Sequence, residues 1–200
     1  MGLTTVKQPH FAIAAVFGTL LLSLPLSAAA ETYDVDSMHS MPSFTFKHLN
    51  LSSFRGRFDQ ITGNIEFDPV HHSGGATIAI NLDSVSTGVP ILDQFLRGAK
   101  FFDTAKFPTA IFTSNSFKFS DEQLVSVSGD LSLHGITKPV VLEIVYLSCR
   151  THPLLNVPSC GADASVTIKR SDFGLAAFIG NDSDEVKVDI SVEALKTQRP

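Results

Sequence analysis

The sequence predicts an all-β protein, a closed or nearly closed antiparallel barrel of eight or nine strands with one short α-helix. Three observations support this prediction. Most of the chain after residue 31 alternates apolar and polar residues with a period of two, turn-forming residues separate the alternating runs, and one segment has helical spacing instead. Closing the sheet into a barrel would also remove exposed edge strands, which favour aggregation.

The N-terminal segment, residues 1–30, is typical of a secretory signal peptide. A lone Lys7 precedes an apolar run without charge, and this run contains Pro25 and ends in three alanines up to Ala30. We expect cleavage after Ala30, which leaves a single domain, residues 31–200, in the periplasm. The alternative is an uncleaved anchor, because roughly 20 apolar residues can cross a bilayer.

The alternation is clearest in "VKVDISVE", where every second residue is apolar and a strand with one buried face is predicted. This face comprises Val186, Val188, Ile190 and Val192. The other runs predicted as strands are 43–48, 53–59, 61–68, 76–82, 110–119, 124–133, 140–147 and 164–170. Among the residues expected to share a face are Ile78, Ile80 and Leu82, and likewise Val125, Val127, Leu131 and Leu133.

Turn and helix signals fall between these runs. "HHSGG" (71–75) separates two strands, "LHGITKP" (133–139) predicts a hairpin, and "GNDSDE" (180–185) leads into the last strand. In "VPILDQFLRGAK" (89–100) the apolar residues follow a spacing of three and four, with Pro90 near the start and Gly98 near the end. This pattern predicts a short amphipathic helix.

Phenylalanine is unusually frequent: the chain has 16 Phe, two Tyr and no Trp. An eight-stranded barrel is either filled by its own side chains or just wide enough for one small ligand. Any single Phe ordinarily belongs to a dry core. Four of them, however, lie on or just after the helix that must cap or flank the barrel, and we expect these to line its mouth. They are Phe95, Phe101, Phe102 and Phe107.

Charge and cysteine content exclude some functions. Removing Lys7 from the 15 Lys and Arg leaves 14 against 20 Asp and Glu, so the mature chain is acidic and not suited to nucleic acid. Cys149 and Cys160 are expected to form a structural disulfide in an oxidising compartment. A catalytic dithiol is the alternative, but the Cys-x-x-Cys spacing of such sites is absent.

Signals for catalysis are few. The sequence has no Gly-rich phosphate loop and no paired histidines with metal-ligand spacing, so neither a metal nor a cofactor is expected. Asp36, His39 and Ser40 could converge with Arg170 to form a polar group, although such residues in turns commonly bond to the backbone instead.

Four segments together resemble the YceI-like family of exported bacterial proteins, in order from about residue 33 to residue 194. They are "YDVDSMHSMPSFTFKHL…FRGRFDQITGNIEFDP", "LDQFLRGAKFFDTAKFPTAIFTS", "VSGDLSLHGITKPVVLEI" and "IKRSDFGL". The resemblance implies an extended eight-stranded lipocalin-like barrel with a long apolar tunnel that binds polyisoprenoid or other long-chain amphiphiles. Leu92, Phe95 and His134 depart from the family pattern, which has Arg, His and Arg there, and this implies a different head group or a neutral lipid.

We therefore expect a periplasmic lipid-binding carrier rather than an enzyme, with an isoprenoid, quinone or fatty-chain lipid as ligand. The residues expected to line the wall are Phe44, Phe46, Phe58, Phe67, Ile80, Phe95, Leu96, Phe101, Phe102, Phe112 and Phe173, and those expected at the mouth are His39, Asp93, His134 and Arg170. A homodimer and a transient contact with the inner membrane are further expectations. Two alternatives stay open: an accessory to membrane electron transfer that binds a quinone, and an enzyme acting on a bound amphiphile with His39 as general base.

Overall fold

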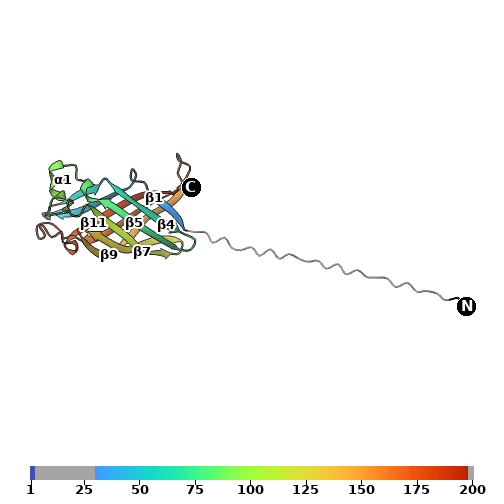
Figure 1. Ribbon diagram of the computed structural model, residues 1–200. Helices are drawn as coiled ribbons and strands as arrows, with labels where there is room; N and C mark the ends of the chain where they lie inside the picture. The colour runs from blue at the N-terminus through green and yellow to red at the C-terminus, as the bar shows by residue number, and fades with distance from the viewer. Residues whose placement is uncertain (3–29, 198–200) are drawn as a thin grey trace.

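The computed structural model describes residues 1–2 and 30–197, and the strands and helices from residue 31 onward form one elongated barrel (Figure 1). Most of the predicted leader, residues 3–29, therefore lies outside the described residues. The strands are β1 Glu31–Val35, β2 Met41–His48, β3 Ser52–Phe58, β4 Ile61–Asp68, β5 Ser73–Asn81, β6 Val85–Ser86, β7 Thr109–Ser120, β8 Gln123–Leu133, β9 Ile136–Thr151, β10 Pro158–Lys169 and β11 Glu185–Lys196. The helices are α1 Pro90–Arg97 and two short 3-10 turns, η1 Leu82–Ser84 and η2 Arg170–Phe173.

The sheet closes on itself as an antiparallel barrel of eight strands, as predicted. The closed ring is β1, β4, β5, β7, β8, β9, β10 and β11, and β11 returns to β1 through pairs such as Tyr33 with Lys196. Strands β2, β3 and β6 extend three strands of this ring. β2 continues the line of β1 along β11, β3 continues into β4, and β6 continues β5. Three of the eight positions in the barrel are therefore each occupied by two consecutive strands with a break between them.

The interruptions and turns follow local chemistry. The β8–β9 hairpin turns through His134 and Gly135, both of which have positive φ, 52° and 77°. Two positive φ values are what a two-residue hairpin loop requires, and glycine adopts this conformation at no steric cost.

The predicted helix is present as α1, which has Pro90 in its first turn and Gly98 as its C-cap. None of the helices among the described residues is long and apolar enough to cross a membrane.

β-Bulges change which residues face inward, and they correct one detail of the sequence analysis. Val125 has no partner in β7, because Lys118 pairs with Ser126 and Phe119 pairs with Leu124. The extra residue reverses the alternation, so Leu124 lines the interior together with Val127, and Val125 does not. The period-two prediction was therefore wrong for Val125.

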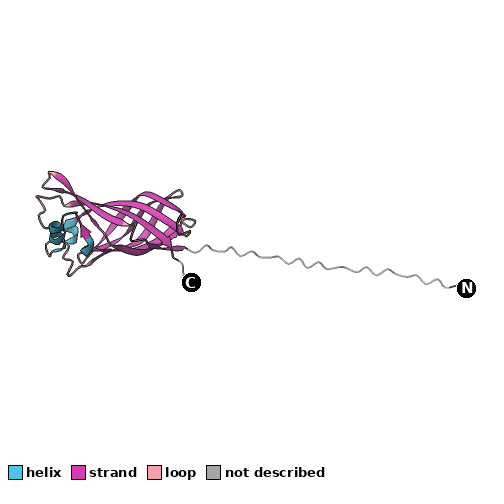
Figure 2. Cartoon of the chain, turned by 90° about the horizontal axis from the view of Figure 1, so that it is seen from above, coloured by secondary structure: helices cyan, strands magenta, loops and turns pink. Residues whose placement is uncertain are grey.

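The two ends of the barrel are built differently (Figure 2). At one end, which we call the helix end, lie α1 and the loops around it. At the other, the terminal end, β1 begins with Glu31 and β11 ends with Lys196; the label C in Figure 1 lies at this end. The terminal end also carries the predicted disulfide, since Cys149 and Cys160 face each other on β9 and β10 and are bonded.

Candidate functional site

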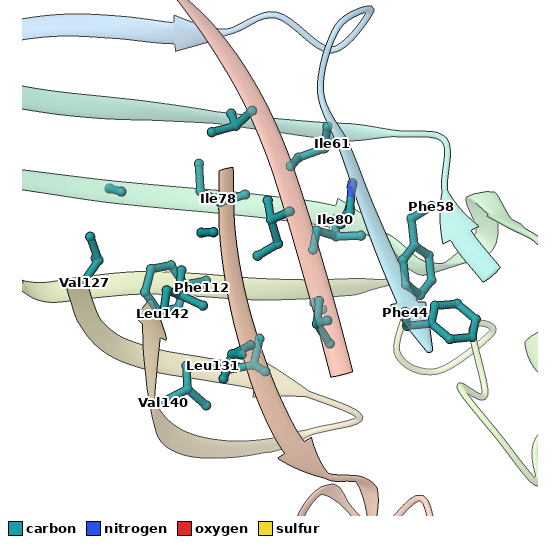
Figure 3. Close-up of a pocket in the computed structure, with 18 of the residues that line it drawn as sticks. Phe44, Phe58, Ile61, Ile78, Ile80, Phe112, Val127, Leu131, Val140 and Leu142 are labelled. Atoms are coloured by element: carbon teal, nitrogen blue, oxygen red, sulfur yellow. The ribbon is translucent and has the colours of Figure 1, made fainter. Parts of the chain in front are cut away.

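An apolar cavity of about 270 Å³ runs inside the barrel. Its lining includes members of both hydrophobic clusters of the protein, one around Phe44 and Leu96 at the helix end and one around Tyr33 and Phe67 at the terminal end. Figure 3 shows side chains from several strands, among them Ile61, Ile78, Phe112 and Leu142, projecting into this interior. The lining is therefore continuous between the two clusters.

Glycines explain why the phenylalanines do not fill the centre. A Cβ on Gly56 would lie 2.3 Å from Phe44 Cζ, and a Cβ on Gly129 would lie 2.6 Å from Phe112. These rings therefore occupy space that a side chain on the neighbouring strand would otherwise take. Because the rings lie against the wall, the axis of the barrel is left open.

Three aromatic rings meet at the helix end of the cavity. The ring centroids of Phe44 and Phe58 are 5.6 Å apart, and Phe102 lies 5.4 Å from Phe58 and 6.4 Å from Phe44. Phe102 comes from the loop after α1, and Leu96 of α1 itself is 8% exposed and also lines the cavity. Side chains of α1 and of the loop after it, together with Phe44 of β2 and Phe58 of β3, thus close this end.

Strands and polar bonds close the terminal end. Tyr33 is 5% exposed, and its hydroxyl donates a hydrogen bond of 2.6 Å to Glu31. Burial and this carboxylate raise the pKa of Tyr33 to about 12, so the phenol stays a donor at all ordinary pH values. Lys196 of β11 also bonds to Glu31 of β1, which ties the first and last strands together.

Most residues expected on the wall do line the cavity. They are Phe44, Phe46, Phe58, Phe67, Ile80, Leu96, Phe101, Phe102 and Phe112. Two lie elsewhere. Phe173 is 1% exposed and packs in the core cluster beside the cavity, while Phe95 is 47% exposed on the outer face of α1. The placement expected for Phe173 and Phe95 was wrong; ligand contact by the others stays a prediction.

The expected aromatic mouth is only half present. Phe101 and Phe102 reach the cavity, but Phe95 packs outside in tilted arrangements against Phe101 and Phe178, at centroid distances of 4.9 and 6.3 Å. Phe107 packs against the His134 ring, 4.6 Å away, below the β8–β9 turn. Helical spacing identified the apolar stripe of α1, but the barrel end covers only part of that stripe.

Of the four residues expected at the mouth, only Arg170 lines the cavity. It is 8% exposed and donates hydrogen bonds to the carbonyl oxygens of Ser183, Leu175 and Ala177. Burial lowers the pKa of the Arg170 guanidinium, while the carboxylates of Asp182 and Asp184 oppose that shift. Arg170 thereby fixes the 171–184 loop over the helix end.

The other three polar residues serve local structure. Asp93 accepts hydrogen bonds from the backbone and hydroxyl of Thr87, and His134 Nδ1 lies 3.2 Å from the Phe173 carbonyl oxygen. The His39 side chain is 58% exposed on the β1–β2 loop and pairs with Asp36 at 2.7 Å. None of the three is among the residues lining the cavity.

The polar group that Asp36, His39 and Ser40 could have formed with Arg170 is not present, and the alternative of bonding to the backbone holds for Ser40. Ser40 bonds to the backbone of Glu193 near the end of β11, whereas the Arg170 N–H donates to the Asp184 carbonyl just before that strand. Nine residues of extended strand separate the two places by about 30 Å. In the 36–40 loop, the side chains form local hydrogen bonds and bonds to the backbone instead of a convergent polar site.

Several lining residues were not among those singled out. They are, among others, Tyr33, Ile61, Ile65, Val140, Leu142 and Leu147. The same period-two pattern could have identified most of them, because they alternate with exposed residues in the predicted strands. Asp182 had no such signal: it lies in a loop, accepts a hydrogen bond from the Leu49 N–H, and its Oδ1 lies 3.0 Å from His48 Nδ1.

Comparison with known proteins supports this geometry. A model of the YceI-like domain matches residues 33–194. Protein YceI of Salmonella agona is 35% identical over 182 residues, covering 90% of this chain and 94% of that protein. Protein YceI of Escherichia coli O157:H7 is 34% identical over 186 residues, covering 92% of this chain and 96% of that protein.

Among the described residues, no group of three or more His, Cys, Asp or Glu could hold a metal ion.

Solved structures share the fold. Burkholderia cenocepacia BcnA superposes with a TM-score of 0.68 at 22% identity, over 80% of this chain and 98% of that one. The Campylobacter jejuni YCEI protein gives 0.66 at 27% identity, over 76% and 90%. A polyisoprenoid binding domain from Saccharophagus degradans gives 0.63 at 23% identity, over 85% and 100%.

Proposed function

This chain belongs to the YceI-like family, and we propose that it is a periplasmic protein that binds and carries a polyisoprenoid or another long-chain amphiphilic lipid. The observation that supports the proposal most is the cavity, which is lined almost entirely by apolar side chains from one end to the other. The polyisoprenoid binding domain of Saccharophagus degradans, which shares the fold, supports the same class of ligand.

The size of the cavity limits the length of the bound tail. An apolar cavity of about 150 Å³ accommodates one benzene molecule. The volume of about 270 Å³ therefore encloses on the order of ten carbon atoms without rearrangement. Longer tails must displace side chains such as Phe101 and Phe102, or emerge at the helix end.

Tail burial would dominate the affinity. Each buried methylene gains roughly 0.8 kcal/mol, so ten carbons gain about 8 kcal/mol. Association costs about 4–15 kcal/mol in lost freedom. A tail confined to the present cavity would bind weakly, and we expect the natural ligand to be longer than ten carbons.

Exchange with a membrane would take place at the helix end. Apolar side chains outside the cavity gather there and form what we call the helix-end patch. The patch comprises Val89, Ile91, Phe95, Phe178 and Ile179, which are 40–69% exposed. Its position beside the segment that closes the cavity suits transfer of a lipid from a bilayer, and the same patch would serve a homodimer.

A tail-length series tests the proposal. Unbranched alcohols and prenyl alcohols of 5 to about 40 carbons would be titrated calorimetrically into the delipidated protein. We expect affinity to rise steeply up to about ten carbons and then less steeply, as longer tails displace side chains. Affinity that does not depend on tail length would contradict the proposal.

A further inference from the structure

Charged side chains are distributed unevenly on the outer wall of β10, β11, β2 and β3. Phe46, Val186 and Ile168 line the cavity, so the residues that alternate with them in the same strands point outward. Towards the helix end, this outer face presents five cations and two anions, and we call it the basic wall. The cations are Lys47, Arg55, Arg57, Lys169 and Lys187, and the anions are Glu185 and Asp189.

The strand register places these cations close together. Lys187 of β11 pairs with Thr45 of β2, and Thr45 pairs in turn with Arg55 of β3. Because neighbouring strands lie about 4.8 Å apart, the backbones that carry Lys187 and Arg55 are separated by roughly 10 Å. Two residues nearer the helix end, Lys169 of β10 pairs with Glu185 of β11. The four strands therefore present one continuous basic face.

Most of this positive charge is not neutralised locally. Arg57 and Lys187 pair with carboxylates two residues further along the chain, each at 2.7 Å. Lys47 donates a hydrogen bond of 3.0 Å to the hydroxyl of Ser53. Within residues 30–197, Lys47, Arg55 and Lys169 form no ion pair with a carboxylate. Three exposed cations are thus available to a negatively charged partner.

Towards the terminal end, the charge of the same wall is reversed. Its exposed outward residues there include Asp163 on β10, Glu193 on β11 and Asp34 on β1. Lys196, a cation of this region, is bonded to Glu31. The charge along this wall therefore changes from negative at the terminal end to positive at the helix end. Such a charge distribution turns the helix end towards a negatively charged surface.

The basic wall adjoins the helix-end patch. The Lys47 N–H donates a hydrogen bond of 2.9 Å to the Ser183 hydroxyl, and the Ser183 N–H donates one of 2.9 Å to the Lys47 carbonyl oxygen. These bonds hold the loop that carries Phe178 and Ile179 against the end of β2. Apolar side chains flanked by lysine and arginine bind the interface of an anionic bilayer, because the former enter the acyl boundary and the latter meet the phosphates.

We infer that the protein docks on bilayers that contain anionic phospholipids, with the basic wall against the phosphate groups and the helix-end patch at the acyl boundary. This inference rests on the proposed function and specifies the surface from which the carrier exchanges its lipid. A second copy of the chain is disfavoured at the basic wall, since a two-fold contact would bring like charges together.

Flotation with lipid vesicles tests the inference on the purified protein. One set of vesicles is phosphatidylcholine alone, and the other contains about 30% phosphatidylglycerol in addition. At about 20 mM salt we expect the anionic vesicles to bind at least 10-fold more tightly than the neutral ones. Most of this difference should disappear at about 1 M salt, where the Debye length is only about 3 Å.

A matched pair of double variants localises the effect. Arg55→Gln with Lys169→Gln should weaken binding to the anionic vesicles about 10- to 30-fold, because each basic residue near an anionic surface strengthens binding about fivefold. The control, Lys118→Gln with Arg150→Gln, changes the net charge equally but lies near the terminal ends of β7 and β9, and should change binding less than twofold. All four side chains are exposed, and circular dichroism checks folding.

The outcomes separate docking from the carrier function. Equal binding to both kinds of vesicle, or equal losses in both double variants, would overturn the inference. So would a change of oligomeric state in the first variant with vesicle binding unchanged, which would make the basic wall an interface between copies. In each of these cases the carrier function stands as long as affinity in the vesicle-free titration still rises with tail length. Docking on anionic vesicles by a protein that takes up no lipid would instead contradict the carrier function alone.

Discussion

The two ends of the barrel enclose the same cavity by different means. At the terminal end, paired strands, the Cys149–Cys160 disulfide and the Glu31–Lys196 bond hold the chain together. At the helix end, side chains of α1 and the following loop reach into the cavity, and α1 is tied to η1 by side chains, such as Arg97 to the Asp83 carbonyl oxygen at 3.3 Å. Backbone ladders open only cooperatively, whereas loops open locally at low free-energy cost.

The difference indicates where a ligand would enter. The terminal end carries buried residues with covalent and polar links, which favour a permanent closure. The helix end combines a loop closure, exposed apolar side chains and the single arginine of the cavity lining. We therefore treat the terminal end as the closed base of the site and the helix end as its entrance.

The largest expected effect concerns the ring that lies against Gly56. Gly56→Ala would place a Cβ 2.3 Å from Phe44 Cζ, so the ring would move into the cavity or towards Phe102. We expect unfolding free energy to fall by about 1–3 kcal/mol and lipid affinity to fall about tenfold, measured by denaturant unfolding and calorimetry. Gly161→Ala near the terminal end is the matched control, because its Cβ would meet no atom closer than 3.8 Å. Equal loss of affinity in both variants would contradict the placement of the Phe44 ring.

The next prediction tests whether the disulfide at the terminal end stabilises the fold without contributing to lipid binding. Replacing Cys149 and Cys160 together by Ser should lower the unfolding free energy by roughly 2–3 kcal/mol, and the melting temperature by about 4–12 °C. Lipid affinity at a temperature where the variant is folded should change less than twofold. A large loss of affinity without a loss of stability would show that the terminal end takes part in entry.

A smaller effect concerns lipid transfer at the entrance. Phe95→Ser in the helix-end patch should slow uptake of a lipid from vesicles several-fold, because less apolar surface can contact the bilayer. Leu154→Ser is the control: Leu154 is 87% exposed in the β9–β10 turn at the terminal end. Stopped-flow transfer of a fluorescent lipid measures both. If Phe95→Ser instead changes only the oligomeric state, the patch is a dimer interface; equal slowing in both variants contradicts entry at the helix end.

The smallest effect is the pH dependence of the His39–Asp36 pair, which lies away from both the entrance and Arg170. Hydrogen bonding to Asp36 raises the pKa of His39, and the same bond lowers the pKa of Asp36. The pair therefore stabilises the fold between about pH 4 and pH 6.5. This stabilisation is lost as the pH rises through the raised pKa of His39, or falls through the lowered pKa of Asp36.

Comparison with His39→Gln measures that contribution. The melting temperature of the wild type should exceed that of the variant by about 1 °C or less near pH 5–6, and the two should coincide by about pH 9. Lipid affinity should be unchanged. A loss of turnover in this variant, with any amphiphilic substrate, would instead support the enzymatic alternative.

The sequence predicted the strands that form the barrel wall better than the loops and helix at its two ends, for physical reasons. Alternation in a strand such as Val186–Val192 reports burial directly, because one face must meet the apolar interior. It failed where a bulge inserted one residue, as at Val125, since bulges depend on the partner strand. Closure into a barrel followed from the eight or nine alternating runs, and the disulfide followed from the cysteine context.

The ends were harder because loops determine them. Leu96 and Phe95 are adjacent on one apolar stripe, yet only Leu96 lies under the loops of the barrel end. Arg170 could be picked as a polar residue among apolar ones, but its carbonyl partners and Asp182 come from a loop without periodic pattern. Which end of the cavity carries the polar group therefore required the three-dimensional structure.

Mass spectrometry of the protein purified without detergent tests the central claim most directly. The spectrum under native conditions, followed by solvent extraction, would show whether the interior holds a guest. The account predicts a stoichiometric apolar-tailed lipid of more than about ten carbons, released on unfolding. Protein that carries no lipid after native purification, and that takes up none from isoprenoid-loaded vesicles, would contradict it.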